Sequence, residues 1–477
     1  MVDAEVERAH KEALRVTRRQ FLKAVAAGIA AGFIGAAGFS GLTPPIFERM
    51  IPPRTRGNYS FGSVDKLRIT CISETSWFMN DTFMDDIRKA GGLLVNQYEI
   101  PWSTEGVVGG WSKENPGVGS NEGGYSALVE TWGPGETYHR WLLDWGWNQE
   151  WMEYIYSQVP APTKDVPPDR LIKGSILDLI KVGQKGIEFI ICSHEHIDHY
   201  WGMDTVLKYY PDVPIWVPGT MYPESWRMLD GVPKGTFKAP YAWNEHPHRG
   251  PRNVVKEPGK PYKIYEGLCV VLFDVPIILR VRGENIPYVW VKDYGVVTVT
   301  GCTHPGIITE LEYAIRTFKD VDYGKNMGGI YGGLHISPFE DWDPDRDDLV
   351  LALPRYGVHS IGANHCTGYI TVGKMIEAGL PVVGGSAQFK TKKDWYLGNS
   401  DQFGLPHEVV EKPLNLKYYG TKLKVIARRQ EEGLRKRLEK MGLDADAIRY
   451  LNRIYAGEEP VKVVSEAKVT TYELGEI

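Results

Sequence analysis

Short apolar runs bounded by turn residues recur after residue 66 and predict β-strands, because β-branched and aliphatic residues favour extended chain. The predicted strands cover residues 67–72, 125–130, 141–144, 186–193, 213–217, 268–273 and 296–300. A further run at 288–292 is separated from 296–300 by Asp293-Tyr294-Gly295, which predicts a tight hairpin.

Helical patterns follow several of these strands, notably at 203–210 and 305–319. Strands that alternate with helices favour a layered α/β domain. We expect four segments: 1–40 as a targeting segment, 41–66 as a Pro-rich linker, 67–400 as the folded domain and 401–477 as a carboxyl-terminal extension. The extension is expected to contain a helix near 421–443. Residues 103–123 and 145–175, rich in Gly and Ser or in Trp, Tyr and Pro, look like loops inserted beside a site.

The targeting segment carries paired arginines, Arg18 and Arg19, and then no charged residue between Lys23 and Glu48. This pattern resembles a twin-arginine export signal. The alternative is a membrane-spanning helix over 24–43, but five glycines and few large aliphatic residues make that span weak. We expect recognition by the twin-arginine export machinery and a periplasmic or cell-surface location. Signal cleavage is left open, so an uncleaved segment remains the one expected membrane contact.

Composition narrows the class of protein. Of the 477 residues, 43% are hydrophobic and 24% are charged, a balance that supports a folded core and excludes general disorder. The net charge is −5 and we see no basic stripe, so nucleic acid is not an expected partner. The five cysteines are scattered and form no C-x-x-C pair, which excludes a disulfide framework.

The strongest chemical signal directly follows the predicted strand 186–193. It reads His194-Glu195-His196-Ile197-Asp198-His199. Residues two apart in extended chain point the same way, so His194 and His196 can bind one ion. As the chain enters a helix, Asp198 and His199 can face a second ion. Imidazole and carboxylate ligands suit zinc, and a pair of ions can hold a bridging hydroxide at neutral pH.

Three later strand ends offer further ligands. They are Thr300-Gly301-Cys302-Thr303-His304, Gly332-Gly333-Leu334-His335 and Asn364-His365-Cys366-Thr367-Gly368.

The His-x-His-x-Asp-His motif after a buried strand resembles the metallo-β-lactamase superfamily. The later motifs are similar to those of one branch, which includes methanopterin-pathway enzymes that attach a dihydropterin-methyl group to an aminobenzene ribofuranosyl phosphate. The resemblance covers about residues 67–390 and implies an αββα sandwich with inserted loops. The branch's usual Asp-Thr-Gly is Asp144-Trp145-Gly146 here. We expect Asp144 to order the metal loop through hydrogen bonds rather than to bind metal.

On this resemblance, His194, His196 and His304 are assigned to the first ion, and Asp198, His199 and His365 to the second. Asp198 would also orient the nucleophile. His335 is either a ligand or a donor that stabilises charge on the substrate. Cys302 either ligates or packs, and packing is favoured; packing is also expected for Cys366. Glu195 alternates away from the ligands, and Tyr200 and Trp201 either narrow the cleft or plug the helix start.

The sequence thus predicts an exported hydrolase with two divalent ions that cleaves an ester, lactone, phosphoester or related bond of a small molecule. Zinc is the favoured metal, and iron or manganese fits the same frame. The main alternative is a transferase related to the methanopterin-pathway enzymes. A non-catalytic metal-binding protein would predict a broken ligand set, and an iron-dependent redox enzyme would need a partner domain that the sequence does not show.

Overall fold

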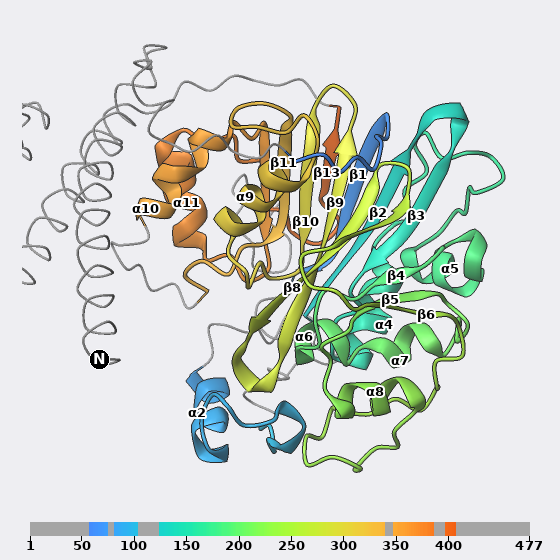
Figure 1. Cartoon of the computed structure of the whole chain (residues 1–477). Helices are drawn as coiled ribbons and strands as arrows, with labels where there is room; N and C mark the ends of the chain where they lie inside the picture. Colours follow the sequence, from blue (N-terminus) through green and yellow to red (C-terminus); the bar gives the residue numbers. More distant parts are fainter. Residues whose placement is uncertain (1–56, 75–80, 104–123, 339–346, 386–395, 407–477) are drawn as a thin grey trace, which may run out of the picture. The chain divides into compact units, whose positions relative to one another are not determined.

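Two β-sheets pack face to face in the computed structural model of the chain (Figure 1). The structure describes residues 57–74, 81–103, 124–338, 347–385 and 396–406. The first sheet has the strand order β13-β1-β2-β3-β4-β5-β6, and the second has the order β12-β11-β10-β9-β8-β7.

In the first sheet, neighbouring strands are antiparallel from β13 to β3 and parallel from β3 to β6. Its strands are β1 (Lys66–Glu74), β2 (Tyr125–Trp132), β3 (Tyr138–Leu143), β4 (Ile190–Ile191), β5 (Ile215–Pro218), β6 (Arg252–Val255) and β13 (Gln402–Leu405).

The second sheet is parallel from β10 to β12 and antiparallel from β7 to β10. Its strands are β7 (Pro261–Tyr265), β8 (Leu268–Pro276), β9 (Arg282–Val291), β10 (Gly295–Thr300), β11 (Met327–Gly333) and β12 (Ser360–Asn364). The predicted hairpin is confirmed, because Gly295 pairs with Val291.

Strand residues alternate between two cores. Val129, Leu143 and Ile191 face the core between the sheets, whereas Leu128, Leu142 and Ile190 face the outer helices. This period of two is what a sheet buried on both faces requires.

Helices cover both outer faces, as Figure 1 shows. The first sheet carries α4 (Gln149–Gln158), α5 (Ile176–Lys181), α6 (Ile197–Tyr200), α7 (Met203–Leu207) and α8 (Pro223–Asp230). Beside the second sheet lie α9 (Ile307–Thr317), α10 (Asp347–Ala352) and α11 (Tyr369–Ala378), and α2 (Asp81–Ala90) precedes β2 in the chain. The predicted αββα sandwich is therefore confirmed.

The segment 145–175, which the sequence indicated as an insertion beside a site, contains α4. Trp145, Trp147 and Trp151 are each 1% exposed and belong to the core beneath the first sheet. Their apolar area is thus used for packing within this core.

Several expected features lie outside the described residues: the export signal, the linker up to residue 56, the loop 104–123 and the helix near 421–443. Within the described part of the chain, no helix is long and apolar enough to cross a membrane. The sheets extend slightly past 67–400, since β1 begins at Lys66 and β13 ends at Leu405.

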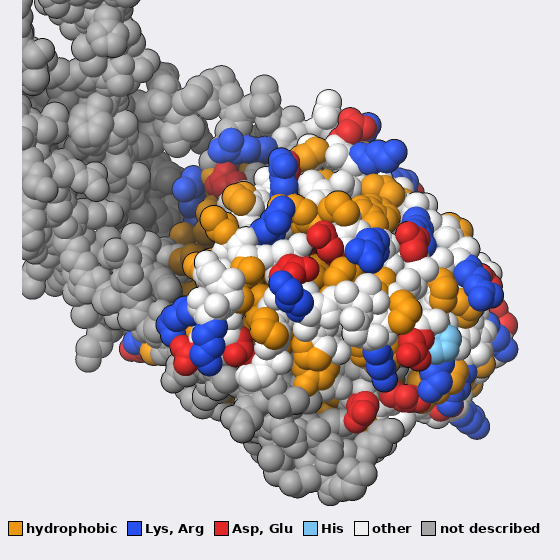
Figure 2. All heavy atoms as spheres, turned by 90° about the horizontal axis from the view of Figure 1, so that it is seen from below, with side chains coloured by type: hydrophobic (Ala, Val, Ile, Leu, Met, Phe, Trp, Pro, Cys, Tyr) orange, Lys and Arg blue, Asp and Glu red, His pale blue; other side chains and the backbone are white. Residues whose placement is uncertain are grey.

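The surface carries mixed charge. On the face in Figure 2, Lys and Arg side chains are interspersed with Asp and Glu, and hydrophobic side chains lie between them.

A buried charge cluster joins β1, β2 and β3. Glu130 lies at 0% exposure, accepts a 2.7 Å hydrogen bond from Arg68 Nε, and has Arg140 Nε at 3.6 Å. Tyr138 donates its hydroxyl to the same carboxylate. Two buried guanidinium groups thus depend on one carboxylate for neutralisation.

We predict that Glu130→Gln lowers the free energy of unfolding by about 3–5 kcal/mol, because it leaves two buried cations without a counter-charge. Urea denaturation would measure the change. Arg88→Gln, which removes one member of an exposed i,i+3 pair with Asp85, is the control and should leave the midpoint unchanged. A Glu130→Gln midpoint equal to that of the control would contradict the prediction.

Candidate metal centre

The predicted ligands meet where the carboxyl ends of parallel strands from both sheets converge. The His194–His199 segment follows β4, Cys302 and His304 follow β10, His335 follows β11, and His365 follows β12. Parallel neighbours end at the same sheet edge, so segments far apart in the sequence are brought together.

His194 and His196 turn ring nitrogens toward each other. His194 Nε2 lies 3.0 Å from His196 Nδ1. The opposite nitrogens are occupied: His194 Nδ1 is 2.9 Å from Ser193 Oγ, and His196 Nε2 is 3.1 Å from the Ile278 carbonyl. Because these partners accept the ring N–H, the tautomers assigned from them leave two lone pairs facing one another.

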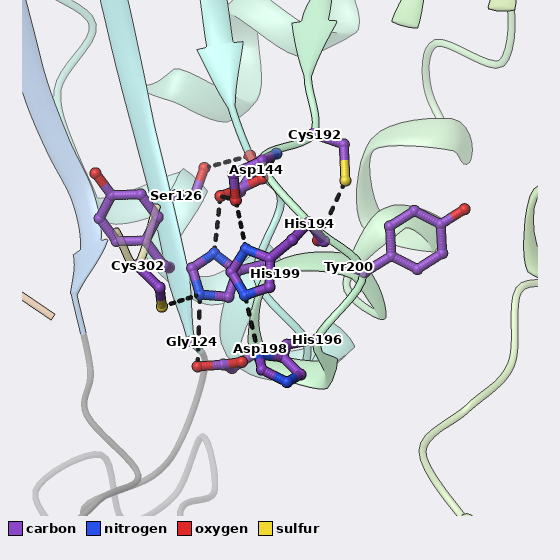
Figure 3. A network of polar contacts seen from close by, with 12 residues as sticks. Gly124, Ser126, Asp144, Cys192, His194, His196, Asp198, His199, Tyr200 and Cys302 are labelled. Atoms are coloured by element: carbon purple, nitrogen blue, oxygen red, sulfur yellow. Dashed lines mark hydrogen bonds and ion pairs between the residues drawn. The ribbon is translucent and has the colours of Figure 1, made fainter. Parts of the chain in front are cut away.

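Asp144 orders this loop, as the sequence predicted. Its carboxylate accepts hydrogen bonds from Ser193 N and Ser193 Oγ, both at 2.6 Å, and from His199 Nδ1 at 2.8 Å (Figure 3). The bond to Nδ1 leaves His199 Nε2 turned toward the centre. A carboxylate behind a histidine ligand fixes the ring and strengthens its basicity.

Glu284 on β9 does the same for the loop after β10, and sequence reasoning missed it. It accepts hydrogen bonds from the backbone N–H groups of Cys302 at 2.9 Å and His304 at 2.7 Å, and from His304 Nδ1 at 3.0 Å. It is fully buried. Its strand begins Arg282-Gly283-Glu284-Asn285, so no local pattern set Glu284 apart from its polar neighbours.

A second group forms around His199 and His365. Their Nε2 atoms are 3.1 Å apart, and Asp198 Oδ2 lies 3.2 Å from His365 Nε2 and 3.7 Å from His199 Nε2. All three side chains are buried. The Tyr125 ring lies against both imidazoles, with centroids 5.5 Å from His199 and 5.0 Å from His365.

Cys302, for which ligation and packing were both open, lies among the candidate ligand atoms of both groups. Its sulfur is 3.1 Å from His199 Nε2. It forms one cluster with His194 and His304 and another with His199 and His365, and the ligand atoms of each cluster lie within 4.8 Å of one another. The sulfur is therefore within reach of both groups of histidines.

His335 and Cys366 lie beside this sulfur. The His335 ring centroid is 4.8 Å from that of His304, and His335 N donates to Cys366 Sγ at 3.3 Å. Together with Cys302 they form a third cluster with the same 4.8 Å limit.

The loops reach this geometry at a conformational cost. Thr303, His335 and His365 adopt φ values of 59°, 47° and 51°, the left-handed region that non-glycine residues rarely occupy. A Cβ at Gly301 would lie 2.3 Å from Ser193 Oγ, so glycine is required for the two loops to approach. Such backbone outliers are typical of functional sites.

Three neighbouring residues face away from the centre. Tyr200 and Trp201 are 0% exposed; Tyr200 donates its hydroxyl to the Ser225 carbonyl, and the Trp201 ring packs on Tyr98. They plug the helix start, and Tyr200 points away from the histidines in Figure 3. Glu195 accepts from Tyr222 N, so it is turned from the ligands as expected.

The pKa shifts of the histidines agree with the tautomers assigned from their hydrogen bonds. Burial lowers the pKa of His196 to about 3 and also lowers the pKa of His194 and His304, so these imidazoles are neutral. Burial opposes the charge on Glu284, but His304 and the loop N–H groups hold its pKa at about 2. His199 differs: burial disfavours its cation, yet Asp198 and Asp144 raise its pKa to about 9.

These residues fit a divalent cation. His304 Nε2 is buried and has no hydrogen-bond partner among the described residues, and the His194–His196 lone pairs point at each other. A buried polar atom without a partner is costly, and a cation between converging lone pairs removes that cost.

We predict that Glu284→Gln weakens metal binding about 10–100-fold, because the amide cannot orient His304 and its loop as the carboxylate does. Competition against a chromophoric chelator would measure the affinity. Glu310→Gln is the matched control, since Glu310 is also a fully buried carboxyl group but belongs to none of the ligand clusters. If both variants bind metal equally, Glu284 has no positioning role.

Comparison with known proteins agrees with this architecture. The model of the metallo-beta-lactamase superfamily matches residues 126–274, which include the His194–His199 motif. The chain is also similar to the 7,8-dihydropterin-6-methyl-4-(beta-D-ribofuranosyl)-aminobenzene-5'-phosphate synthase of Methanocaldococcus jannaschii. The two are 25% identical over 223 residues, which is 40% of this chain and 70% of the relative.

Solved structures give distant likenesses. A metal-dependent hydrolase of the beta-lactamase superfamily, Tm1679, is 17% identical with a TM-score of 0.39; the match covers 72% of this chain and 99% of that one. An N-acyl homoserine lactone hydrolase is 13% identical with a TM-score of 0.25, and the match covers 50% and 76%. These TM-scores are too low to support any inference about function.

The two packed sheets with helices on both outer faces, together with the match over 126–274, show that the described part of the chain has the metallo-β-lactamase fold.

Proposed function

We propose that this protein is a metal-dependent hydrolase with a dinuclear centre that cleaves an ester, lactone, phosphoester or related bond of a small molecule. One observation carries the proposal: two buried ligand clusters, His194/Cys302/His304 and His199/Cys302/His365, share a single sulfur atom.

The chain's residues have separate tasks. His194, His196 and His304 would hold one ion, and Asp198, His199 and His365 the other, with Cys302 within reach of both. Two divalent ions, when bound, would supply a hydroxide at neutral pH and polarise the oxygen of the bond to be cleaved. The low pKa of Asp198, which His199 and His365 impose against the effect of burial, keeps this carboxylate ionised to bind and orient.

His335 is suited to the substrate side of the centre. Like His304, it is partly exposed, whereas the histidines of the 194–199 segment and His365 are buried. From beside His304 it can donate a hydrogen bond to an oxygen that becomes negative during the reaction. Zinc is the proposed metal because the donor set combines imidazole, carboxylate and thiolate.

A transferase is the second candidate. It is favoured by the similarity to the methanopterin-pathway synthase, which is a sequence relationship and extends over 223 residues. The proposed export disfavours it, since pterin intermediates of that kind are cytoplasmic. Export itself is proposed from Arg18 and Arg19 and the uncharged segment after them.

We predict that His196→Ala abolishes hydrolysis of whichever ester, lactone or phosphoester the wild type cleaves in a panel, and lowers metal content. The lost ligand belongs to the centre and to no part of the sheets, so circular dichroism should change little. Elemental analysis of protein purified without added metal should find about two zinc per wild-type chain.

His139→Ala is the matched control, because His139 pairs with Glu188 away from the centre. It should keep the wild-type metal content and activity. Wild-type turnover by His196→Ala would refute the mechanism, and iron in place of zinc would favour a redox enzyme.

Metal affinity should depend on pH. Below its pKa of about 9, His199 carries a proton that binding must displace. The affinity should therefore rise at least about tenfold per pH unit between about pH 7 and pH 9. Calorimetry in buffers with different ionisation enthalpies would count the released proton. An affinity that is constant over this range would show that His199 is already neutral.

A further inference from the structure

Three residues of the strand-end motifs offer donor atoms in addition to the histidines and Asp198 that are assigned to the two ions. They are Cys302, which can serve both ions, and His335 and Cys366, which neither ion requires. Each comes from a different motif: Cys302 follows β10, His335 follows β11 and Cys366 follows β12.

Their donor atoms form a cluster of their own. The Cys302 sulfur, the Cys366 sulfur and a His335 ring nitrogen all lie within 4.8 Å of one another. Both sulfurs are buried, with exposures of 2% and 0%, and both cysteines are free thiols.

The backbone is shaped to bring these atoms together. A Cβ at Gly333 would lie 2.6 Å from Cys366 Sγ, so the absence of a side chain there lets the sulfur approach β11. His335 adopts φ 47°, a conformation that non-glycine residues rarely adopt. The Cys366 sulfur also contacts the Cys302 loop, since it lies 3.7 Å from the Cys302 carbonyl.

We propose that Cys302, His335 and Cys366 form a third metal position, selective for a soft thiophilic ion, that adjoins the two histidine positions and shares the Cys302 sulfur with them. Two thiolates and an imidazole are a softer donor set than either histidine group. Such ligands select a soft ion such as Cu⁺ over Mg²⁺ or Mn²⁺. A thiolate has several lone pairs, so sharing Cys302 does not exclude simultaneous occupation.

Cadmium ions are a suitable probe, because Cd²⁺ is thiophilic and its bonds to thiolate absorb in the ultraviolet. The full chain, kept reduced with a phosphine, would be dialysed against excess Cd²⁺. Elemental analysis would then count ions, and the thiolate-to-cadmium absorbance would report the sulfur ligands. The wild type should bind about one equivalent more than Cys366→Ser or His335→Ala.

Cys269→Ser is the matched control, since Cys269 is a buried thiol on β8 and belongs to none of the three clusters. It should keep the full count and absorbance. His196→Ala separates this proposal from the hydrolase proposal: it should lose histidine-bound metal but retain the absorbance that depends on Cys366.

Equal cadmium counts in the wild type, Cys366→Ser and His335→Ala would overturn the third position. So would an absorbance that is lost with Cys302→Ser alone and unchanged in Cys366→Ser. A soft-ion count that exceeds the Mn²⁺ count by about one equivalent in the wild type, and in neither variant, would support it.

Discussion

Two buried carboxylates, Asp144 and Glu284, fix the loops on which the candidate centre depends. Asp144 binds the Ser193 backbone and the His199 ring, and Glu284 binds the Cys302–His304 backbone and the His304 ring. Each carboxylate offsets the energetic cost of its burial by accepting several hydrogen bonds. In doing so, each turns the free nitrogen of one histidine toward a common point.

The two sheets supply the frame for this arrangement. The parallel strands β3–β6 and β10–β12 end at the same edge, while their antiparallel portions carry no ligand. The core between the sheets keeps these edges in register. Close approach of the loops then needs small residues, such as Gly301 beside Ser193. The cost of the left-handed backbone at Thr303, His335 and His365 is tolerated because the surrounding sheets fix these residues.

Sulfur distinguishes this centre from one built on imidazole and carboxylate alone. Cys302 lies between the two histidine groups, and Cys366 and His335 extend the donor set to one side. A thiolate shared between ions would soften both positions and favour zinc over manganese. The sequence spacing around Cys302 could not distinguish a cysteine that binds metal from one that only packs, since both would be small buried residues between turn residues.

The sequence by itself determined the fold class and the hairpin, and it singled out the candidate metal ligands at 194–199 and in the later histidine motifs, because strand periodicity and ligand spacing are local properties. Only tertiary structure decided which donors meet. Glu284 lies some twenty residues before His304, so their contact is not visible in the sequence. The strands β6 and β7 were not predicted, because half-exposed edge strands lack a continuous apolar run. The burial of Trp145, Trp147 and Trp151 and the position of Cys302 likewise depend on contacts between segments that are distant in the sequence. A local sequence pattern cannot predict such contacts.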